Sequence, residues 1–409
     1  MTKLTLTEEF IRAIPKTDLH VHLDGSLRIP TLIELAKKQG VELPSYTEEG
    51  LRELVFKDAY ANLAEYLQGF AYTCAVLQNA EALERAAYEL AADSFSEGIR
   101  YLEPRFAPQL HVSDELDMPA IMQAVNRGLE QARDEFNQLP AVASGQEPPY
   151  DYGIIACALR MFDANFSAYY NQFMQVHAYS PSRAAHSMAS MELARAMVRV
   201  RDELGLPIVG FDLAGCEDGF PAHAHVSAYR HAHRNFMHKT VHAGEAYGPE
   251  SIFEAITLLH ADRIGHGFHL FSKDKINCEL GEGEDEESYV RELSEYIADR
   301  RITLEVCLTS NLQTNPALST LADHPWRKMN DARISTTFCT DNRLVSNTSL
   351  TREISLAAEH LGLTPNELKN CVIYGFKRSF MRQNYIAKRR YVRRIIDYYD
   401  EIERRFGFQ

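Results

Sequence analysis

The chain has 409 residues, with 43 Lys and Arg against 57 Asp and Glu, and so a formal net charge of −14. An acidic chain lacks the positive field that nucleic acids and anionic membranes attract, so we expect neither as a partner. Hydrophobic residues make up 45% and charged residues 24%, which is typical of a globular protein and excludes a disordered chain.

The chain offers no signal for export or membrane insertion. No run of about 18 apolar residues is present, and the N-terminal segment carries acids where a signal peptide has an apolar stretch. The seven cysteines are an odd number without close pairs, which predicts free thiols. We therefore expect a cytoplasmic protein.

Eight short apolar runs recur along the chain, separated by segments with apolar residues at every third or fourth position. Strand and helix alternating eight times predict an α/β fold, the (β/α)8 TIM barrel. The predicted strands lie in 17–24, 99–108, 152–162, 207–215, 239–245, 263–268, 301–311 and 333–342.

Two connections are longer than a simple crossover requires. Residues 25–98 are predicted to form a helical insertion after the first strand, and residues 109–150 a second one after the second strand. Residues 376–409 are predicted to form a helical tail. We expect one domain over 1–409, because barrels of this length often fold as a single unit.

Two charge runs have an ordinary structural interpretation. Residues 279–287 hold six acids in nine positions and read as an exposed loop. The basic run 388–394 reads as the outer face of a closing helix, with Tyr391, Ile395 and Tyr398 turned inward, rather than as a nucleic-acid site.

Polar and ionisable residues gather at the C-terminal ends of the predicted strands. In a parallel barrel these ends meet at one mouth, where active sites are built, so we expect the side chains to converge. They are His22, Asp24, Arg105, Arg160, Asp212, His242, Glu245, His266, Asn311, Asp341 and Asn342.

His20 and His22 are two positions apart on a predicted strand and therefore point to the same face. A His-x-His pair alone is common on protein surfaces. With His242 and Asp341 at the same mouth, however, three imidazoles and one carboxylate form the ligand pattern of a catalytic zinc ion that keeps one position open.

Two further residues are candidates for acid–base chemistry. Glu245 lies beyond the strand end, where a carboxyl group can exchange protons with a substrate, although an acid at the start of a helix is also favourable by itself. His266 lies between Gly265 and Gly267, which permit close approach to a bound water. Its alternative is a core histidine bonded to the backbone.

The segments TDLHVHLDGS, DLAGCE, VHAGEAYGPESI, RIGHG, CLTSNLQT and FCTDN together resemble the adenosine deaminase family of metal-dependent amidohydrolases. The resemblance implies one Zn²⁺ per chain, held by His20, His22, His242 and Asp341. It also implies hydrolytic deamination of a small purine nucleoside in purine salvage: adenosine, and 2′-deoxyadenosine as well, would yield the 6-oxo nucleoside (inosine from adenosine) and ammonia.

The resemblance further implies individual roles. Glu245 would protonate purine N1, and His266 would position and deprotonate the attacking water, with Asp341 as an acceptor. The implied substrate contacts are His22, Asp24, Gly215 and Asn342, with Asp24 at the ribose 5′-hydroxyl and the Gly215 N–H facing N3.

The chain departs from the family at Asn342, where many relatives carry a second aspartate. That carboxyl must be protonated to donate a hydrogen bond to purine N7, whereas an amide donates without a proton. We therefore expect the contact to be kept and its pH dependence to differ.

Other functions remain open from the sequence. A sister deaminase would act on adenine, adenosine monophosphate or a modified adenosine, and a binding protein would keep the barrel without the chemistry. Asp24 argues against the monophosphate, because a carboxylate repels a phosphate. The ligand set with a P-C-x-x-C pair, used by deaminases of nucleic-acid bases, is not present. The oligomeric state is not predicted.

Overall fold

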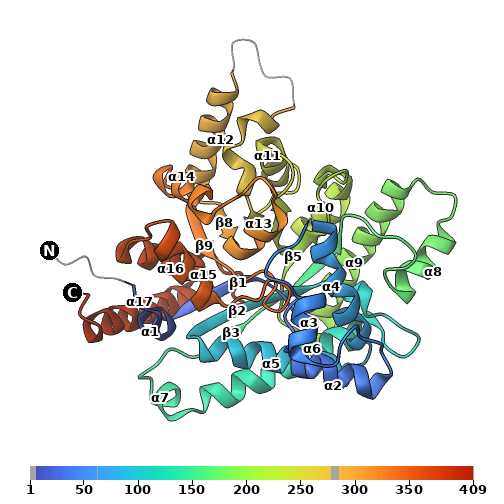
Figure 1. Ribbon diagram of the computed structural model, residues 1–409, viewed down its shortest axis with the longest axis horizontal. Coiled ribbons are helices and arrows are strands. Elements are labelled where there is room, and N and C mark those ends of the chain that lie inside the picture. The colour runs from blue at the N-terminus through green and yellow to red at the C-terminus, as the bar shows by residue number, and fades with distance from the viewer. Residues whose placement is uncertain (1–5, 62, 278–284, 409) are drawn as a thin grey trace.

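The structure is a computed structural model that describes residues 6–61, 63–277 and 285–408. Its strands are all parallel and follow the order β1-β2-β4-β5-β6-β7-β8-β9 around the barrel (Figure 1), which confirms the predicted fold. The strands are β1 (Lys16–His22), β2 (Ile99–Phe106), β3 (Asp151–Tyr152), β4 (Ile154–Leu159), β5 (Ile208–Ala214), β6 (His238–Ala243), β7 (Arg263–His266), β8 (Thr303–Val306) and β9 (Ser335–Phe338).

The ring closes beyond the end of β9. Val21 of β1 pairs with Asp341 in a parallel bridge. The Asp341 amide donates to the carbonyl of His20 at 2.8 Å, and the His22 amide donates to the carbonyl of Asp341 at 2.6 Å. The closure therefore places Asp341 directly beside the two histidines of β1.

Each predicted run contains a strand, but the predicted bounds of two runs are wrong. The run 152–162 covers the end of β3 and all of β4, and β3 pairs only with β2. The run 301–311 ends as a strand at Val306, because residues from Leu308 onward form α13 (Leu308–Thr314). All residues of β1 and β2 are buried, since barrel strands are covered on both faces.

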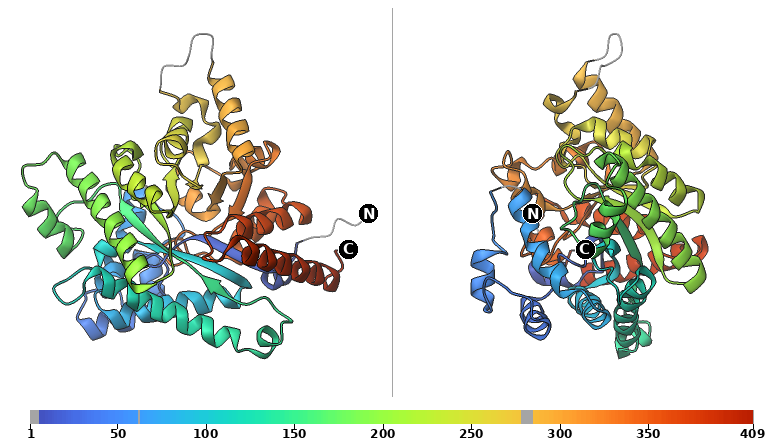
Figure 2. Two further views of the ribbon diagram at one scale, coloured as in Figure 1. Left: turned by 180° about the vertical axis from the view of Figure 1, so that it is seen from behind. Right: turned by 90° about the vertical axis from the view of Figure 1, so that its right-hand side faces the viewer.

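The predicted insertion 25–98 consists of four helices, α2 (Ile29–Gln39), α3 (Glu48–Leu54), α4 (Leu63–Val76) and α5 (Ala80–Ser96). The insertion after β2 holds η1 (Pro108–Leu110), α6 (Met118–Asn137) and α7 (Pro140–Ala143). Asn79 and Asp117 cap α5 and α6 through their side chains, which explains where both helices begin. The views in Figure 2 show helices surrounding the strands.

After β4 the chain alternates strands with further helices. They are α8 (Ala168–Val176), α9 (Ser182–Leu204), η2 (Ala222–His225), α10 (Val226–Arg234), α11 (Pro249–Thr257), η3 (Phe268–Phe271), η4 (Lys273–Lys275), α12 (Glu286–Arg300), η5 (Leu321–Asp323), α14 (Trp326–Asp331), α15 (Leu350–His360) and α16 (Pro365–Arg378).

The first and last helices pack together, as Figure 1 shows at its left. The tail forms α17 (Tyr385–Arg405), and Phe10 of α1 (Glu8–Ala13) contacts the ring of Tyr399 with centroids 6.1 Å apart. Tyr391 and Ile395 are buried as predicted. Tyr398 is only half-buried, because its neighbour Tyr399 takes the inward position.

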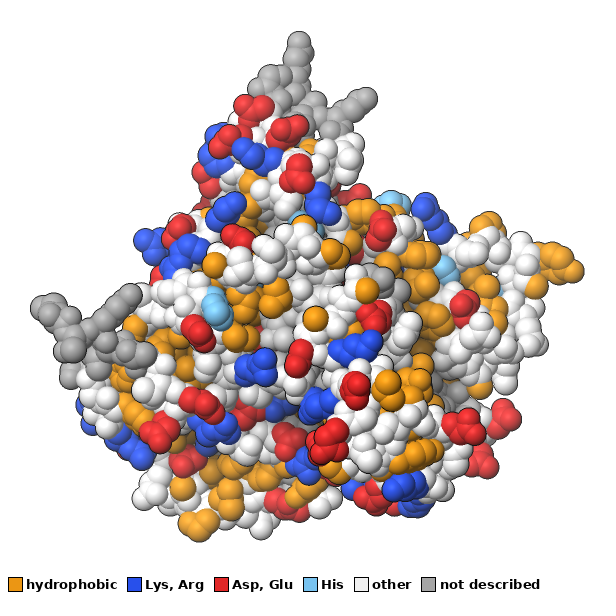
Figure 3. Space-filling view, in the orientation of Figure 1, with side chains coloured by type: hydrophobic (Ala, Val, Ile, Leu, Met, Phe, Trp, Pro, Cys, Tyr) orange, Lys and Arg blue, Asp and Glu red, His pale blue; other side chains and the backbone are white. Residues whose placement is uncertain are grey.

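The surface charges are mixed. In Figure 3 the basic side chains of one face lie among acidic ones rather than in a continuous patch. Of the acidic run, residues 279–284 lie outside the described residues, and Asp285 caps α12. The six cysteines that the structure describes are all free thiols. Within the described residues, no helix is long and apolar enough to cross a membrane.

Candidate active site

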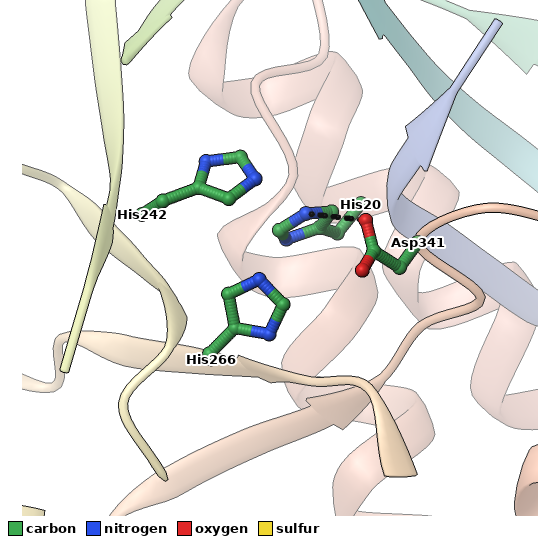
Figure 4. Close-up of side chains that lie close together, drawn as sticks. All are labelled: His20, His242, His266 and Asp341. Carbon is green, nitrogen blue, oxygen red and sulfur yellow. Dashed lines mark ion pairs between the residues drawn. The ribbon is translucent and has the colours of Figure 1, made fainter. Parts of the chain in front are cut away.

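Three histidines and one aspartate converge at the mouth of the barrel. Nε2 of His22 lies 3.3 Å from Nε2 of His242 and 3.5 Å from Oδ1 of Asp341. Nε2 of His20 lies 3.4 Å from the same Oδ1 atom, the contact that Figure 4 marks with a dashed line. Ligand atoms about 2.0 to 2.1 Å from a tetrahedral ion are about 3.3 Å apart, so this spacing fits a zinc-sized cation.

The donor atoms are free for a metal. Nε2 of His20 is buried and faces Oδ1 of Asp341, another atom of the cluster, at 3.4 Å. Burial holds the pKa of His22 well below its usual value, so that ring is neutral and carries a lone pair. Figure 4 shows His266 beside the cluster, and a grouping of His20, His242, His266 and Asp341 also keeps its donor atoms within 4.8 Å. The shorter contacts of His22 favour His22 as the third imidazole ligand.

Two carboxylates orient the metal-site histidines from behind. Oε2 of Glu305 lies 2.9 Å from Nδ1 of His20, and Oδ2 of Asp212 lies 3.1 Å from Nδ1 of His242. Each contact turns the other ring nitrogen toward the centre of the cluster. Sequence reasoning missed Glu305, although a glutamate inside an apolar strand run is the signal that would have found it.

The barrel interior holds a buried ionic network. Arg105 contacts Asp212 and Glu305, each at 2.9 Å, and Arg263 contacts Glu305 at 2.6 Å and also pairs with Glu103. Arg105 was expected at the mouth, but it lies inside the barrel beneath the histidines. With Asp341, four acids face two arginines, so a divalent cation bound here would balance the two excess negative charges.

The backbone is strained at two residues of the cluster. Asp341 and His266 have positive φ angles of 59° and 63°, which non-glycine residues seldom adopt. A Cβ atom at Gly265 would lie 2.9 Å from the ring of His20, so the glycine is needed for that ring to pack where it does. The fold therefore keeps these side chains in place despite the unfavourable backbone conformations of Asp341 and His266.

Glu245 faces the same mouth. Its side chain is 13% exposed, and Oε1 lies 3.9 Å from Nε2 of His266. Burial, followed by the negative charges of Asp341 and Glu217, raises the pKa of Glu245 to about 8. The group therefore keeps its proton to a higher pH than an ordinary carboxyl group and can give that proton to a bound substrate.

Glu217 fixes the loop that carries Glu245, a role that sequence reasoning missed. Its Oε2 atom accepts the amide N–H groups of Glu245, Ala246 and Tyr247 at 2.9, 2.7 and 3.0 Å. Its Oε1 atom accepts the Gly244 amide at 3.1 Å and the Ser251 hydroxyl. One buried carboxylate thus holds four successive backbone groups.

A chain of hydrogen bonds sets the protonation pattern of His266. The backbone N–H of Trp326 donates to Nδ1 of His324 at 3.1 Å, so the neutral His324 ring carries its proton on Nε2. That proton points to Oδ1 of Asn311 at 3.2 Å, and the Asn311 amide donates to Nδ1 of His266 at 3.1 Å. Burial holds the pKa of His266 well below its usual value. The neutral ring therefore carries its proton on Nε2, toward the mouth.

A cavity of about 640 Å³ opens above the cluster. It is lined by His22, Asp24, Gly215, His242, Glu245, His266, Asp341 and Asn342, and by apolar side chains such as Phe70, Leu110 and Met161. Its volume suits a small organic ligand. Among the described residues that line it there is no lysine or arginine.

Two residues in the cavity wall, Asp24 and Asn342, offer polar groups to a ligand. Asp24 is 3% exposed, its Oδ1 atom has no hydrogen-bond partner in residues 6–61, 63–277 and 285–408, and burial raises its pKa to about 7. Asn342 donates one amide hydrogen to Tyr66 at 2.7 Å and retains a second. A Cβ atom at Gly25 would collide with the Asn342 side chain, so this glycine makes room for the amide.

Of the other predicted mouth residues, Asn311 and Asp212 support histidines as described above. Arg160 is buried and donates to the carbonyls of Phe220, at 2.9 Å, and of His242. Gly215 has a φ of 94°, a value that favours glycine.

A parallel barrel with such a cluster and a largely buried carboxyl group at its mouth has the architecture of hydrolases that activate water with a divalent ion. The family model described as adenosine deaminase matches residues 15–398. An adenosine deaminase from Mycolicibacterium vanbaalenii is 34% identical over 92% of this chain and 93% of its own length. A probable adenosine deaminase from Dictyostelium discoideum is 35% identical over 92% of this chain, which spans 42% of that protein. The chain belongs to the adenosine deaminase family, whose members are hydrolytic deaminases.

Solved structures share the fold. An amidohydrolase from Burkhoderia ambifaria with bound zinc has a TM-score of 0.75 at 20% identity, covering 100% of this chain and 97% of its own. An adenine deaminase from Arthrobacter aurescens has a TM-score of 0.70 at 20% identity, covering 95% and 100%. An Arabidopsis N6-mAMP deaminase has a TM-score of 0.70 at 24% identity, covering 95% and 99%.

Proposed function

We propose that the protein catalyses zinc-dependent hydrolytic deamination of adenosine and 2′-deoxyadenosine to the corresponding 6-oxo nucleosides, inosine and 2′-deoxyinosine, with release of ammonia. The observation that carries the proposal is a largely buried carboxyl group, Glu245, facing the same cavity as the His and Asp cluster. One Zn²⁺ would be held by His20, His22, His242 and Asp341. When bound, a divalent ion lowers the pKa of water and makes a nucleophile available at neutral pH.

The protein groups divide the proton transfers between them. Glu245 gives its proton to N1 of the purine, which makes C6 electrophilic. Asp341 accepts one proton from the attacking water and returns it to the departing amino group, which leaves as ammonia. The second proton of the water leaves the C6 oxygen as the carbonyl group forms, and Glu245 is reprotonated. The Nε2–H group of His266 donates to the attacking oxygen and fixes its direction. In this proposal His266 acts as a donor, not as the base that the family resemblance implies.

The remaining wall positions the nucleoside. The second amide hydrogen of Asn342 donates to N7, the Gly215 N–H faces N3, and Asp24 accepts from the ribose 5′-hydroxyl. The cavity has far more room than adenine requires, and it offers no cationic side chain for a phosphate. These features favour a nucleoside over the free base or the monophosphate, the substrates that the names of two structural neighbours suggest.

The magnitude of this discrimination follows from Asp24. A phosphate about 4 Å from its carboxylate is repelled by about 4 kcal/mol at an effective dielectric constant near 20. That energy corresponds to about a thousandfold in affinity. Because burial raises the pKa of Asp24 to about 7, its charge is present above that pH and lost as the pH falls.

The test is a comparison of kcat/KM for four substrates at pH 8, with metal-replete protein and loss of the adenosine absorbance as the signal. Adenosine and 2′-deoxyadenosine should exceed the monophosphate and adenine by at least about 100-fold. Asp24→Asn should reduce the ratio of kcat/KM for adenosine to kcat/KM for adenosine monophosphate. Equal rates on adenosine and the monophosphate would refute the role of Asp24, and no turnover of any nucleoside by zinc-loaded protein would refute the function.

A further inference from the structure

A second cluster of metal-ligating side chains lies in the cavity wall, apart from the three histidines and Asp341. It consists of Asp24, Cys74 on α4 and His111, which directly follows η1. One donor atom from each residue lies within 4.8 Å of the others. Asp24 and Cys74 line the cavity, whereas His111 is fully buried behind them.

His111 is oriented in the manner of a metal ligand. Its Nδ1 atom lies 3.0 Å from the carbonyl oxygen of Leu77, which can only accept, so Nδ1 carries the ring proton. Nε2 therefore presents a lone pair, and it is buried without a hydrogen-bond partner among the residues that the structure describes. A backbone carbonyl that binds the outer nitrogen is the usual support of a metal-bound histidine. Leu77 directly follows α4, so the same helix end positions both the thiol and the imidazole.

The carboxylate provides the second unsatisfied atom. Within the described part of the chain, Oδ1 of Asp24 is buried without a partner, as is Nε2 of His111. Buried polar atoms in folded proteins are almost always paired, so two orphaned acceptors beside one thiol call for a donor or a cation between them. The lining of the cavity includes no lysine or arginine among the described residues that could supply one.

We propose that Asp24, Cys74 and His111 form a second cation site for a thiophilic divalent ion such as Zn²⁺ or Cd²⁺. Thiolate and imidazole select these ions over Mg²⁺ and Ca²⁺. The thiol releases its proton to solvent on binding, and the resulting thiolate and carboxylate charges neutralise the dication. Bonds of about 2.0 to 2.3 Å require the three donor atoms to move together by about 1 Å. The fourth position faces the cavity.

This site has a regulatory consequence that rests on the proposed function. Asp24 cannot coordinate a cation and accept the ribose 5′-hydroxyl in the same geometry. Excess zinc therefore competes with the nucleoside, so the apparent KM rises while kcat is unchanged. We expect a KM increase of at least about tenfold when the second site is saturated.

The binding test uses zinc-loaded holoenzyme titrated with Cd²⁺. The proposed ligands of the catalytic ion include no cysteine, so an ultraviolet thiolate-to-cadmium band reports a thiol site. We expect the parent protein to bind about one additional equivalent of Cd²⁺ and to show this band. The variants Cys74→Ser, Cys74→Ala and His111→Gln should lose both the additional equivalent and the band. Cys216→Ser is the matched control, since Cys216 lines the same cavity, and it should keep the band.

The outcomes separate the two proposals. Loss of the band in Cys216→Ser but not in the Cys74 variants overturns the site, as does binding of no second equivalent by folded protein. A second equivalent that leaves KM unchanged overturns the competition. If the protein does not deaminate adenosine, the proposed function fails, while the stoichiometry and the band still decide the cation site. Thermal unfolding of each variant shows which ones are folded and can be interpreted.

Discussion

Glu217 offers a sharp test of how the catalytic loop is held. The Glu217→Gln variant keeps the shape of the side chain but replaces one carboxylate oxygen by an amide nitrogen. If the remaining oxygen serves the three amides of Glu245, Ala246 and Tyr247, the new NH₂ group faces the Gly244 N–H. That amide hydrogen then has no acceptor, while Ser251 can turn to accept.

The magnitude follows from these contacts. An orphaned buried N–H costs about 1 to 3 kcal/mol, and three hydrogen bonds that lose their charge each weaken by about 0.5 to 1 kcal/mol. Relief from burying a charge offsets part of this loss. We therefore expect the free energy of unfolding to fall by about 2 to 4 kcal/mol. We also expect kcat/KM to fall at least about tenfold, because the proton donor loses its fixed position.

Urea unfolding and steady-state kinetics provide the measurements, with metal content as a check that the zinc site is intact. Glu254→Gln is the control, because Glu254 is a partly exposed acid that pairs with the partly exposed His223 at 3.4 Å. Its effect should stay within about 0.5 kcal/mol. Parent-like stability and turnover in Glu217→Gln would refute the idea that one carboxylate organises this loop.

Three further predictions concern the chemistry. Glu245→Gln should keep its metal and lower kcat by at least about 100-fold. Parent-like turnover in this variant would exclude Glu245 as the proton donor. Because the neutral form of Glu245 is the donor, activity of the parent protein should be present below the raised pKa of about 8 and be lost as the pH rises through it. A bound cation shifts that loss to lower pH. Purified protein should hold about one Zn²⁺, and His20→Ala or Asp341→Ala should lose metal and activity together; turnover that survives chelation would contradict the ligand assignment. Asn342→Ala should lower kcat/KM by about 5 to 150-fold through one lost hydrogen bond, and a 7-deaza substrate should suffer less in the variant than in the parent; equal losses would show that Asn342 does not touch N7.

The sequence predicts the barrel because eight short strand-like runs alternate with segments that carry apolar residues at every third or fourth position. It does not predict where a strand ends. Residues 308–311 were assigned to a strand, yet the chain turns there into α13. The helix places Ser310 against Asp341 at 2.5 Å and Asn311 against His266. Contacts with segments distant in sequence decide this boundary, and local composition does not contain them.

Part of the His and Asp cluster could be predicted from positions along the strands. His20 and His22 share a face by strand alternation alone, and His242 and Asp341 end other strands. Glu305 was missed because its partners, His20, Arg105 and Arg263, lie on three other strands. A buried charge is intelligible only when its counter-charges are seen, and no spacing along the chain reveals them.

The direction of the His266 proton shows a deeper limit of sequence reasoning. A histidine near a cation suggests a base, and nothing in RIGHG indicates otherwise. In the structure the backbone N–H of Trp326, which can only donate, begins a chain of hydrogen bonds. The chain runs through His324 and Asn311 and ends at Nδ1 of His266, which must accept. Each step follows because the preceding atom can only donate or only accept. In the neutral state Nε2 of His266 therefore already holds its proton, and the ring can direct an oxygen nucleophile by donation while Asp341 takes the proton that the reaction releases.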